Sequence, residues 1–267
     1  MLPQFDHLVI YVPNLEEAIK DFTDLGFEVR RGGSHGIAEN ALIIFSNHVY
    51  IELLALVPAW YTPLLLAANR FGVLHWLSGA KGNVRSRLLN WFRQDFGPVD
   101  WCVRVADIEG ISNSWKKAGL SMLNTEKHSR KTIEGDVLQW YLGSASSADL
   151  PFLLEDISPI DERIPPLKSG AHDNGASALR HITFRVKNKA SSEKIAATFL
   201  SHESLNTNIN LGSLSVSFEE KPMPCRVLVK VSRMVNRTSQ VGIIESHGVG
   251  IHFVSSAETI SSTLTAS

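Results

Sequence analysis

A repeated order of strand and helix patterns limits the folds open to this chain more than any other feature. Residues 5–12 (FDHLVIYV) are rich in β-branched and aromatic side chains and are followed by Pro and Asn, which predicts a strand. Asn14 can cap a helix whose apolar residues repeat at helical spacing, and Gly26 ends that helix. Further strand patterns lie at residues 27–30, 41–45 and 48–57. The first unit is therefore predicted to be β-α-β-β-β.

The same order recurs twice along the chain. In the second unit, strand patterns lie at residues 99–105, 137–142 and 151–157, around a helix that begins after Asp107 and ends at Gly119. The third, looser unit opens with residues 179–186 (LRHITFRV), which align with residues 5–12 without a gap and place His181 on His7. It continues with a helix near 191–202, a loop over 201–210 and strands at 214–219, 227–231 and 251–254. One such unit leaves a sheet face uncovered, so the units are expected to pair.

Changes in composition between the units predict the domain boundaries. We expect a first domain over residues 1–158, built from units at 5–57 and 98–158. A Pro- and Gly-rich linker over 159–178, the third unit over 179–255 and a tail over 256–267 follow it. Residues 59–97 form a basic insertion with helical periodicity, and a solvated helical hairpin packed on the sheet is favoured over a substrate lid.

Composition and charge exclude several classes of protein. The 267 residues carry 26 Lys and Arg against 27 Asp and Glu, so nothing indicates nucleic acid or a membrane surface as a partner. Two distant cysteines make neither a disulfide scaffold nor a zinc finger. The absence of a signal-peptide pattern and of an uninterrupted apolar span predicts a cytoplasmic protein. Motifs for nucleotides and for serine hydrolases are also absent, so we expect a small-molecule ligand and leave a homodimer open.

The predicted units carry sequences that point to a known family. DHLVIYV, ENALIIF and VYIELLAL in the first unit, with EGDVLQWYL and LPFLLED in the second, resemble the glyoxalase-like branch of the vicinal oxygen chelate superfamily. The resemblance implies an α+β fold in which β-α-β-β-β modules pair into cupped, barrel-like mixed sheets, with the third module looser. Members of this superfamily often hold one divalent metal, so Zn, Fe or Mn is the implied cofactor.

The resemblance also implies metal ligands on the first and fourth strands of paired modules. His7 falls on the first-strand position of module one and Glu52 on its fourth strand, and both are the implied catalytic residues. Glu155 takes the fourth-strand position of module two, but Trp101 stands at its first-strand position. Three protein ligands remain where the metalloenzymes usually have four. The open positions would let a metal polarise a carbonyl group of the substrate.

These residues also have ordinary structural explanations. A single His on an apolar strand is commonly a core residue that bonds a backbone carbonyl. Glu52 is harder to explain in this way, because burying an unpartnered carboxylate costs on the order of several kcal/mol. Its carboxylate must therefore face water, a cation, an Arg or His7. Glu155 precedes a turn, where a carboxylate is often solvated.

A rival ligand set comes from the third module. If modules one and three pair, His181 and His252 join His7 and Glu52. The set then contains the two His and one carboxylate that suit non-haem iron. Pairing of consecutive modules is favoured over this arrangement.

Substrate contacts are implied by the same resemblance. His35 and Asn40 keep the family pattern at the entry to the third strand, although other residues replace its Gly-Thr pair. Arg130 could hold a carboxylate and Trp140 could stack on a ring, with Trp101 as a further contact.

The sequence therefore predicts a divalent-metal-dependent enzyme that acts on a small oxygen-rich metabolite by lyase, isomerase or dioxygenase chemistry. A metal-free protein that binds or sequesters a small molecule is the first alternative, favoured by Trp101 at a ligand position. A non-catalytic interaction scaffold, with the third module and residues 59–97 as its surface, is the second.

Overall fold

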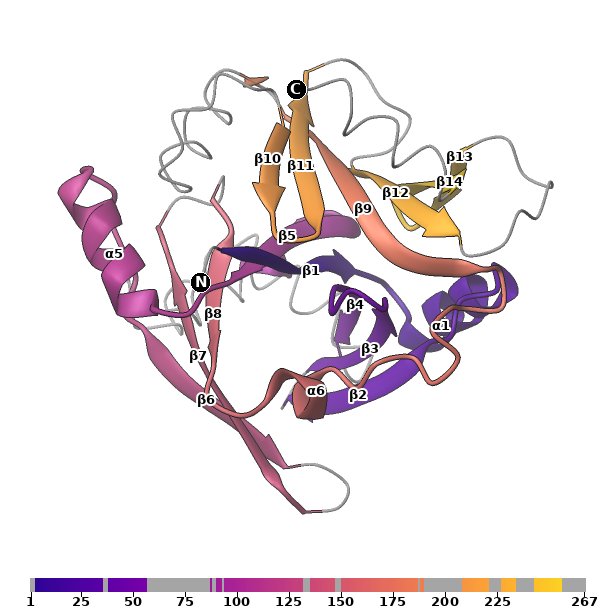
Figure 1. Ribbon diagram of the computed structural model, residues 1–267, viewed down its shortest axis with the longest axis horizontal. Helices are drawn as coiled ribbons and strands as arrows, with labels where there is room; N and C mark the ends of the chain where they lie inside the picture. The colour runs from indigo at the N-terminus through magenta and orange to yellow at the C-terminus, as the bar shows by residue number, and fades with distance from the viewer. Residues whose placement is uncertain are drawn as a thin grey trace, which may run out of the picture.

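Two mixed β-sheets form the body of the described part of the protein, seen here in a computed structural model (Figure 1). The structure describes residues 3–35, 38–56, 87, 90–92, 94–131, 135–146, 150–186, 188–189, 208–220, 227–233 and 243–255. The predicted tail, the predicted helix near 191–202 and most of the insertion over 59–97 lie outside the described residues.

The first sheet is built from two β-α-β-β-β modules. Module one comprises β1 (Gln4–Tyr11), α1 (Leu15–Asp24), β2 (Arg30–His35), β3 (Ala38–Ile44) and β4 (Tyr50–Leu56). Module two comprises β5 (Gly97–Arg104), α5 (Ile108–Lys117), β6 (Glu126–Lys131), β7 (Val137–Ser144) and β8 (Phe152–Asp156). The strand order is β2-β3-β4-β1-β5-β8-β7-β6, with the modules joined through the antiparallel pair β1–β5. The predicted α+β fold of paired β-α-β-β-β modules is confirmed, and the consecutive modules are the ones that pair.

The second sheet has the same topology with fewer strands. It contains β9 (Ala176–Arg185), β10 (Asn208–Leu211), β11 (Leu214–Glu219), β12 (Val227–Arg233), β13 (Ile243–Ser246) and β14 (Val249–Ser255), in the order β10-β11-β9-β12-β14-β13. The antiparallel pair β9–β12 stands where β1–β5 stands in the first sheet. The parallel partners β11 and β14 stand where β4 and β8 stand. The region expected to be one loose module thus holds two shortened halves.

One hydrophobic core lies between the two sheets. Leu8 and Ile10 of β1 share it with Ile182 of β9 and with Val229 and Ile251 of the second sheet. Figure 1 shows the second sheet above the first, with α1 and α5 on opposite sides of the molecule. The other face of the first sheet therefore remains available for a site.

The helix ends follow the capping signals in the sequence. The Asn14 side chain accepts hydrogen bonds from the N–H groups of Glu16 and Glu17 at the start of α1, and Asp107 accepts one from Gly110 in α5. Gly26 follows α1 with a φ of 81°, a conformation that a side chain disfavours. The predicted N-terminal caps of both helices and the predicted end of α1 at Gly26 are confirmed.

Four edge strands differ from the sequence predictions, and one of them, β13, lies where no strand was predicted. β2 begins at Arg30 rather than at residue 27, and the polar edge strand β6 had no apolar alternation to reveal it. β10 occupies residues expected to be a loop. The predicted linker is ordered and carries a short helix, α6 (Ile160–Arg163), before β9 begins at Ala176. Edge strands need only one paired side, so their sequences are the least constrained.

Among the described residues, no helix has the length and apolar character needed to span a membrane.

Candidate active site

A cavity of about 420 Å³ opens on the concave face of the first sheet, away from the shared core. Its wall is mostly aromatic and aliphatic, and a smaller group of polar side chains reaches it from β1, β3, β4, β6 and α6. The polar or ionisable lining residues are His7, Asn40, Tyr50, Glu52, His128, Arg130 and Arg163. A largely apolar cavity with a few convergent polar groups is the usual form of a small-molecule site.

His7 lies at the floor of this cavity with a fixed orientation. Its Nδ1 is 2.7 Å from Oδ1 of the fully buried Asp6. The β1–β5 register shifts between Phe5 and His7, which allows two consecutive residues to meet in this way. Since a carboxylate can only accept, Nδ1 carries the hydrogen and Nε2 is left to face the cavity.

Glu52 faces His7 across the floor. Its Oε2 is 3.5 Å from Nε2 of His7, and Asn40 Nδ2 donates to its Oε1. The Asn40 amide therefore fixes the carboxylate with one oxygen toward His7. The buried Asn40 Oδ1 has no hydrogen-bond partner in the described part of the chain.

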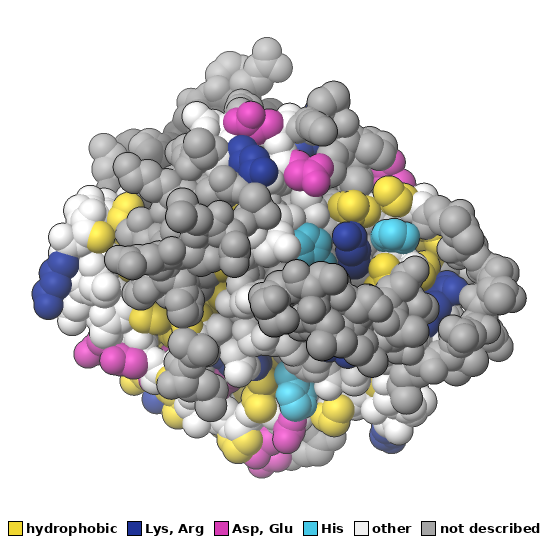
Figure 2. All heavy atoms as spheres, turned by 45° about the horizontal axis from the view of Figure 1, so that its top comes forward, with side chains coloured by type: hydrophobic (Ala, Val, Ile, Leu, Met, Phe, Trp, Pro, Cys, Tyr) yellow, Lys and Arg dark blue, Asp and Glu magenta, His cyan; other side chains and the backbone are white. Residues whose placement is uncertain are grey.

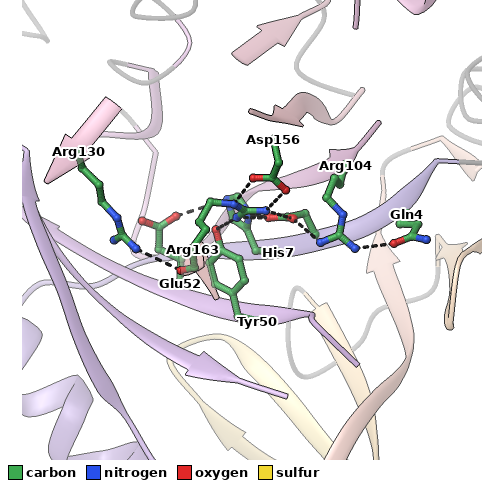
Figure 3. A network of polar contacts seen from close by, with 9 residues as sticks. Gln4, His7, Tyr50, Glu52, Arg104, Arg130, Asp156 and Arg163 are labelled. Atoms are coloured by element: carbon green, nitrogen blue, oxygen red, sulfur yellow. Dashed lines mark hydrogen bonds and ion pairs between the residues drawn. The ribbon is translucent and has the colours of Figure 1, made fainter. Parts of the chain in front are cut away.

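Arg163 of α6, in the predicted linker, forms ion pairs with the residues of this floor. Its guanidinium donates twice to Asp6, at 3.1 and 2.7 Å, and also binds Asp156 at 2.6 and 3.0 Å. Arg104 adds a contact of 3.2 Å to Asp6. Figure 3 shows Arg163 between Asp156, Tyr50 and His7, with Glu52 on the side toward Arg130. Asp6 thus keeps its charge, and its pKa lies well below the usual range because Arg163 and His7 outweigh the cost of burial.

Aromatic rings hold the His7 imidazole in place. Tyr50 stacks on it at 4.5 Å between ring centroids, and Phe152 meets it edge-on at 5.2 Å. The Tyr50 hydroxyl accepts from Arg163 at 3.3 Å, and burial together with the charge of Asp6 raises its pKa well above the usual value. The phenol is therefore neutral.

The opposite wall comes from module two. Trp140 and His128 stack at 6.4 Å between ring centroids, and both line the cavity with Arg130. Arg130 donates to the backbone carbonyl of Arg163 at 3.2 Å (Figure 3). The structure thus brings Asn40, Arg130 and Trp140 to the cavity that holds His7 and Glu52.

Two predicted residues of module two lie on the other face of the sheet. Glu155 accepts a hydrogen bond from the N–H of Ile108 at 2.8 Å, at the start of α5. Trp101 packs in the shared core, against Phe5 and Phe184. Neither reaches His7, so neither is a ligand or a substrate contact in this arrangement. Both strands are buried on both faces, and a one-residue error in register moves a side chain to the opposite face.

Two of the remaining predicted residues, His181 and His252, are placed apart from this floor. His181 and His252 belong to the second sheet, beyond the shared core, so the rival set with His7 and Glu52 does not assemble. His35 pairs with Ala38 at the end of β2, and its side chain is outside the described part of the structure.

The topology shows which residues of module two correspond to His7 and Glu52. His7 pairs with Cys102 across β1–β5, and Tyr50 and Phe152 are their respective parallel partners. Two residues further along the fourth strands, Leu154 corresponds to Glu52. Cys102 and Leu154, not Trp101 and Glu155, are therefore the related positions.

The described residues do not fit a resident divalent metal. Leu154 has no donor atom, so His7 and Glu52 supply two ligands where catalytic sites usually have three. Asp6, His7 and Cys102 also have ligand atoms within 4.8 Å of one another. However, Asp6 is already bound by Arg163, and burial raises the pKa of the Cys102 thiol well above its usual value. A cation there would compete with the guanidinium of Arg163 for the Asp6 carboxylate.

Asp6, Tyr50 and Arg163 were not among the residues predicted from the sequence. Asp6 directly precedes His7, which was a usable signal, but residues adjacent on a regular strand point to opposite faces. Arg163 lies 157 positions from Asp6, and no local pattern connects the two.

The glyoxalase-like domain family matches residues 5–200 of the sequence. The chain belongs to the glyoxalase-like domain family. No curated protein matches its sequence. Among solved structures, this glyoxalase-like chain is similar to a hypothetical protein from Staphylococcus aureus, with 14% identity and a TM-score of 0.66 over 95% of this chain and 100% of that one. This likeness extends the shared fold to the second sheet.

Two structures with named activities are more distantly similar to this glyoxalase-like protein. The Mn(II)-bound glyoxalase from Novosphingobium aromaticivorans has 11% identity and a TM-score of 0.47, over 94% of this chain and 81% of that one. A catechol 2,3-dioxygenase has 12% identity and a TM-score of 0.43, over 86% of this chain and 75% of that one.

Proposed function

We propose that this protein is an enzyme that binds a small amphipathic molecule in the concave cavity and transfers a proton next to its carbonyl group. The observation that carries the proposal is the pair at the floor, in which Nε2 of His7 lies 3.5 Å from Oε2 of Glu52. Asp6 fixes the other ring nitrogen, as a carboxylate does for a histidine that serves as a base.

The geometry of the pair supports proton transfer. With Nδ1–H bound to Asp6, both Nε2 and Oε2 present lone pairs to the same small space. Glu52 would take a proton from the carbon next to the carbonyl, whose C–H electrons form the enolate. The proton on Glu52 can form a hydrogen bond to Nε2 of His7 while the enolate exists. Glu52 then gives the proton back to the same carbon or to a neighbouring one, which gives isomerase chemistry.

The lining supports a substrate with an apolar body and an oxygen-bearing end. Trp140 would pack on the apolar body, and Arg130 would bind a carboxylate through its guanidinium. Asn40 would act through Glu52, because its amide holds that carboxylate in place. The wall is less polar than an oxygen-rich metabolite would need.

Exchange of substrate hydrogen with solvent deuterium tests the proposal directly. 2-Oxo acids with aromatic or branched side chains are incubated with the protein in D₂O, and loss of the signal of the hydrogen next to the carbonyl is followed by proton NMR. We expect exchange with the natural protein, none with Glu52→Gln or His7→Gln, and full exchange with Glu155→Gln. Binding without exchange in the natural protein would contradict the enzymatic proposal.

A divalent metal, Zn, Fe or Mn, remains a prediction that elemental analysis decides. We measure metal content in the purified protein and in His7→Ala and Glu52→Ala. A stoichiometric metal that both variants lose would show that residues outside the described part complete the site. The lyase and dioxygenase chemistries would then regain support.

A metal-free protein that only binds a small molecule is the second candidate, favoured by the mostly apolar wall around the Glu52 carboxylate. Binding of an aromatic 2-oxo acid that Glu52→Gln leaves unchanged, without exchange, would favour it. The scaffold alternative depended on the third module and on residues 59–97, and most of residues 59–97 lie outside the described part of the chain. A cytoplasmic location and a homodimer also remain predictions.

A further inference from the structure

The second sheet repeats the row of residues that forms the active-site floor, with different chemistry. In the first sheet the row Tyr50–His7–Cys102–Phe152 crosses β4, β1, β5 and β8. The corresponding row of the second sheet crosses β11, β9, β12 and β14 and reads Ser215–His181–Lys230–His252. His181 therefore occupies the position of His7 in the repeated topology.

The imidazole of His181 is held on both sides, as that of His7 is, but by hydroxyl groups. Its Nδ1 is 2.7 Å from Ser215 Oγ, and its Nε2 is 2.9 Å from Ser217 Oγ. Ser217 stands two residues beyond Ser215, where Glu52 stands in the first sheet, and donates to Thr183 at 3.1 Å. Serine hydroxyls thus contact His181 where the carboxylates of Asp6 and Glu52 contact His7. The row of the second sheet therefore carries no negative charge of its own.

Lys230 gives the row a positive charge. Its neighbours Val229 and Val231 are buried in the shared core, so strand alternation directs Lys230 to the outer face. There it lies opposite His181 on the antiparallel strand β9, where Cβ atoms of such pairs are about 5 Å apart, and it pairs with His252 on the parallel strand β14. In Figure 2, which brings this side forward, His side chains lie next to Lys or Arg side chains on the surface.

The charge of Lys230 is not neutralised by a carboxylate of the described residues. Glu219 shares this face at the end of β11, opposite Arg185, and Glu245 shares it on β13, opposite Gly250. Neither forms an ion pair with Lys230. Burial and the neighbouring Lys230 lower the pKa of His181 to about 4, so this imidazole is neutral near pH 7 and leaves the ammonium group as the charge of the row.

We propose that the outer face of the second sheet is a second binding site, in which Lys230 and His252 bind a carboxylate or phosphate group beside the His181–serine network. An oxyanion would supply acceptor atoms for the Lys230 ammonium and the His252 imidazole, for which no side-chain acceptor is found among the described residues. The site is independent of the cavity in the first sheet, and neither proposal requires the other.

Titration with simple anions, followed by NMR of the histidine ring protons at pH 7, tests this site. Sodium phosphate and sodium acetate are compared with sodium chloride at equal ionic strength, and His→Gln variants assign the signals. We expect saturable shifts of the His252 and His181 signals with phosphate or acetate and none with chloride. The anion that binds more tightly shows whether the site takes a phosphate or a carboxylate group. Lys230→Gln should weaken binding about tenfold or more, whereas Lys127→Gln on exposed β6 should not change it.

Two results would overturn the proposal. One is the absence of saturable shifts with either oxyanion, and the other is equal binding by Lys230→Gln and the natural protein. If Lys230→Gln does not fold, Lys230→Arg and His252→Gln replace it, and the proposal requires the first to bind and the second to bind more weakly.

Discussion

At the scale of single residues, the floor of the active site depends on a buried carboxylate that is charged at every ordinary pH. Asp6 is fully buried and is bound by Arg163, Arg104 and His7. Removing one partner of a buried ion pair leaves the other uncompensated, which costs about 3–5 kcal/mol. In Asp6→Asn, Arg163 keeps its ion pair with Asp156, so its charge is still partly compensated. We therefore expect this variant to lower the free energy of unfolding by about 3 kcal/mol, the lower end of that range, in urea denaturation. Asp24→Asn, which removes the exposed pair with Lys20, should have no measurable effect.

The same carboxylate determines part of the response to acid. The folded-state pKa of Asp6 is far below that of an unfolded Asp, near 3.9, so its contribution to stability is present above that value and is lost as pH falls below it. Between pH 5 and pH 3 the natural protein should therefore lose more stability than Asp6→Asn. Equal losses in denaturation experiments at the two pH values would show that Asp6 is not ionised in the folded state.

At the scale of elements, Glu155 belongs to helix α5 rather than to the site. Its carboxylate accepts from the N–H of Ile108, where the helix dipole also favours a negative charge. We expect Glu155→Gln to lower the free energy of unfolding by about 1 kcal/mol while ligand binding in the cavity stays unchanged. Loss of ligand binding in this variant, measured by calorimetry, would show that Glu155 contributes to the binding site.

The linker is the second element whose chemistry can be tested. His172 accepts a hydrogen bond at Nδ1 from the N–H of Glu28 and packs edge-on against Phe27 and Phe45. Burial lowers its pKa to about 4, below the 6.5 of an unfolded His. Its unfolded form therefore binds a proton that the folded form excludes, so stability falls as pH drops from 6.5 to 4. In His172→Asn, unfolding in this range should take up about one proton fewer, as judged from urea denaturation against pH.

At the scale of the whole molecule, the two sheets are expected to unfold together because they share one core. Trp101 lies in that core, where it contacts Phe5 of the first sheet and Phe184 of the second. Trp101→Ala should lower the free energy of unfolding by about 3–5 kcal/mol and keep a single transition. Separate transitions by fluorescence and circular dichroism would contradict a shared core.

The sequence by itself determined the order of elements in module one, most of that order in module two, and the N-terminal caps of both helices. The association of His7 with Glu52 was implied only by the family resemblance. The elements and caps depend on local periodicity and on capping chemistry, whereas the cost of burying Glu52 showed only that its carboxylate needs a partner. Only the tertiary structure decided which of two adjacent residues faces the cavity, as with Cys102 rather than Trp101 and Leu154 rather than Glu155. Both faces of these strands are buried, so apolar alternation carries no information about direction. Arg163 became part of the floor only because the linker returns to β1, a contact between distant residues that no local pattern encodes.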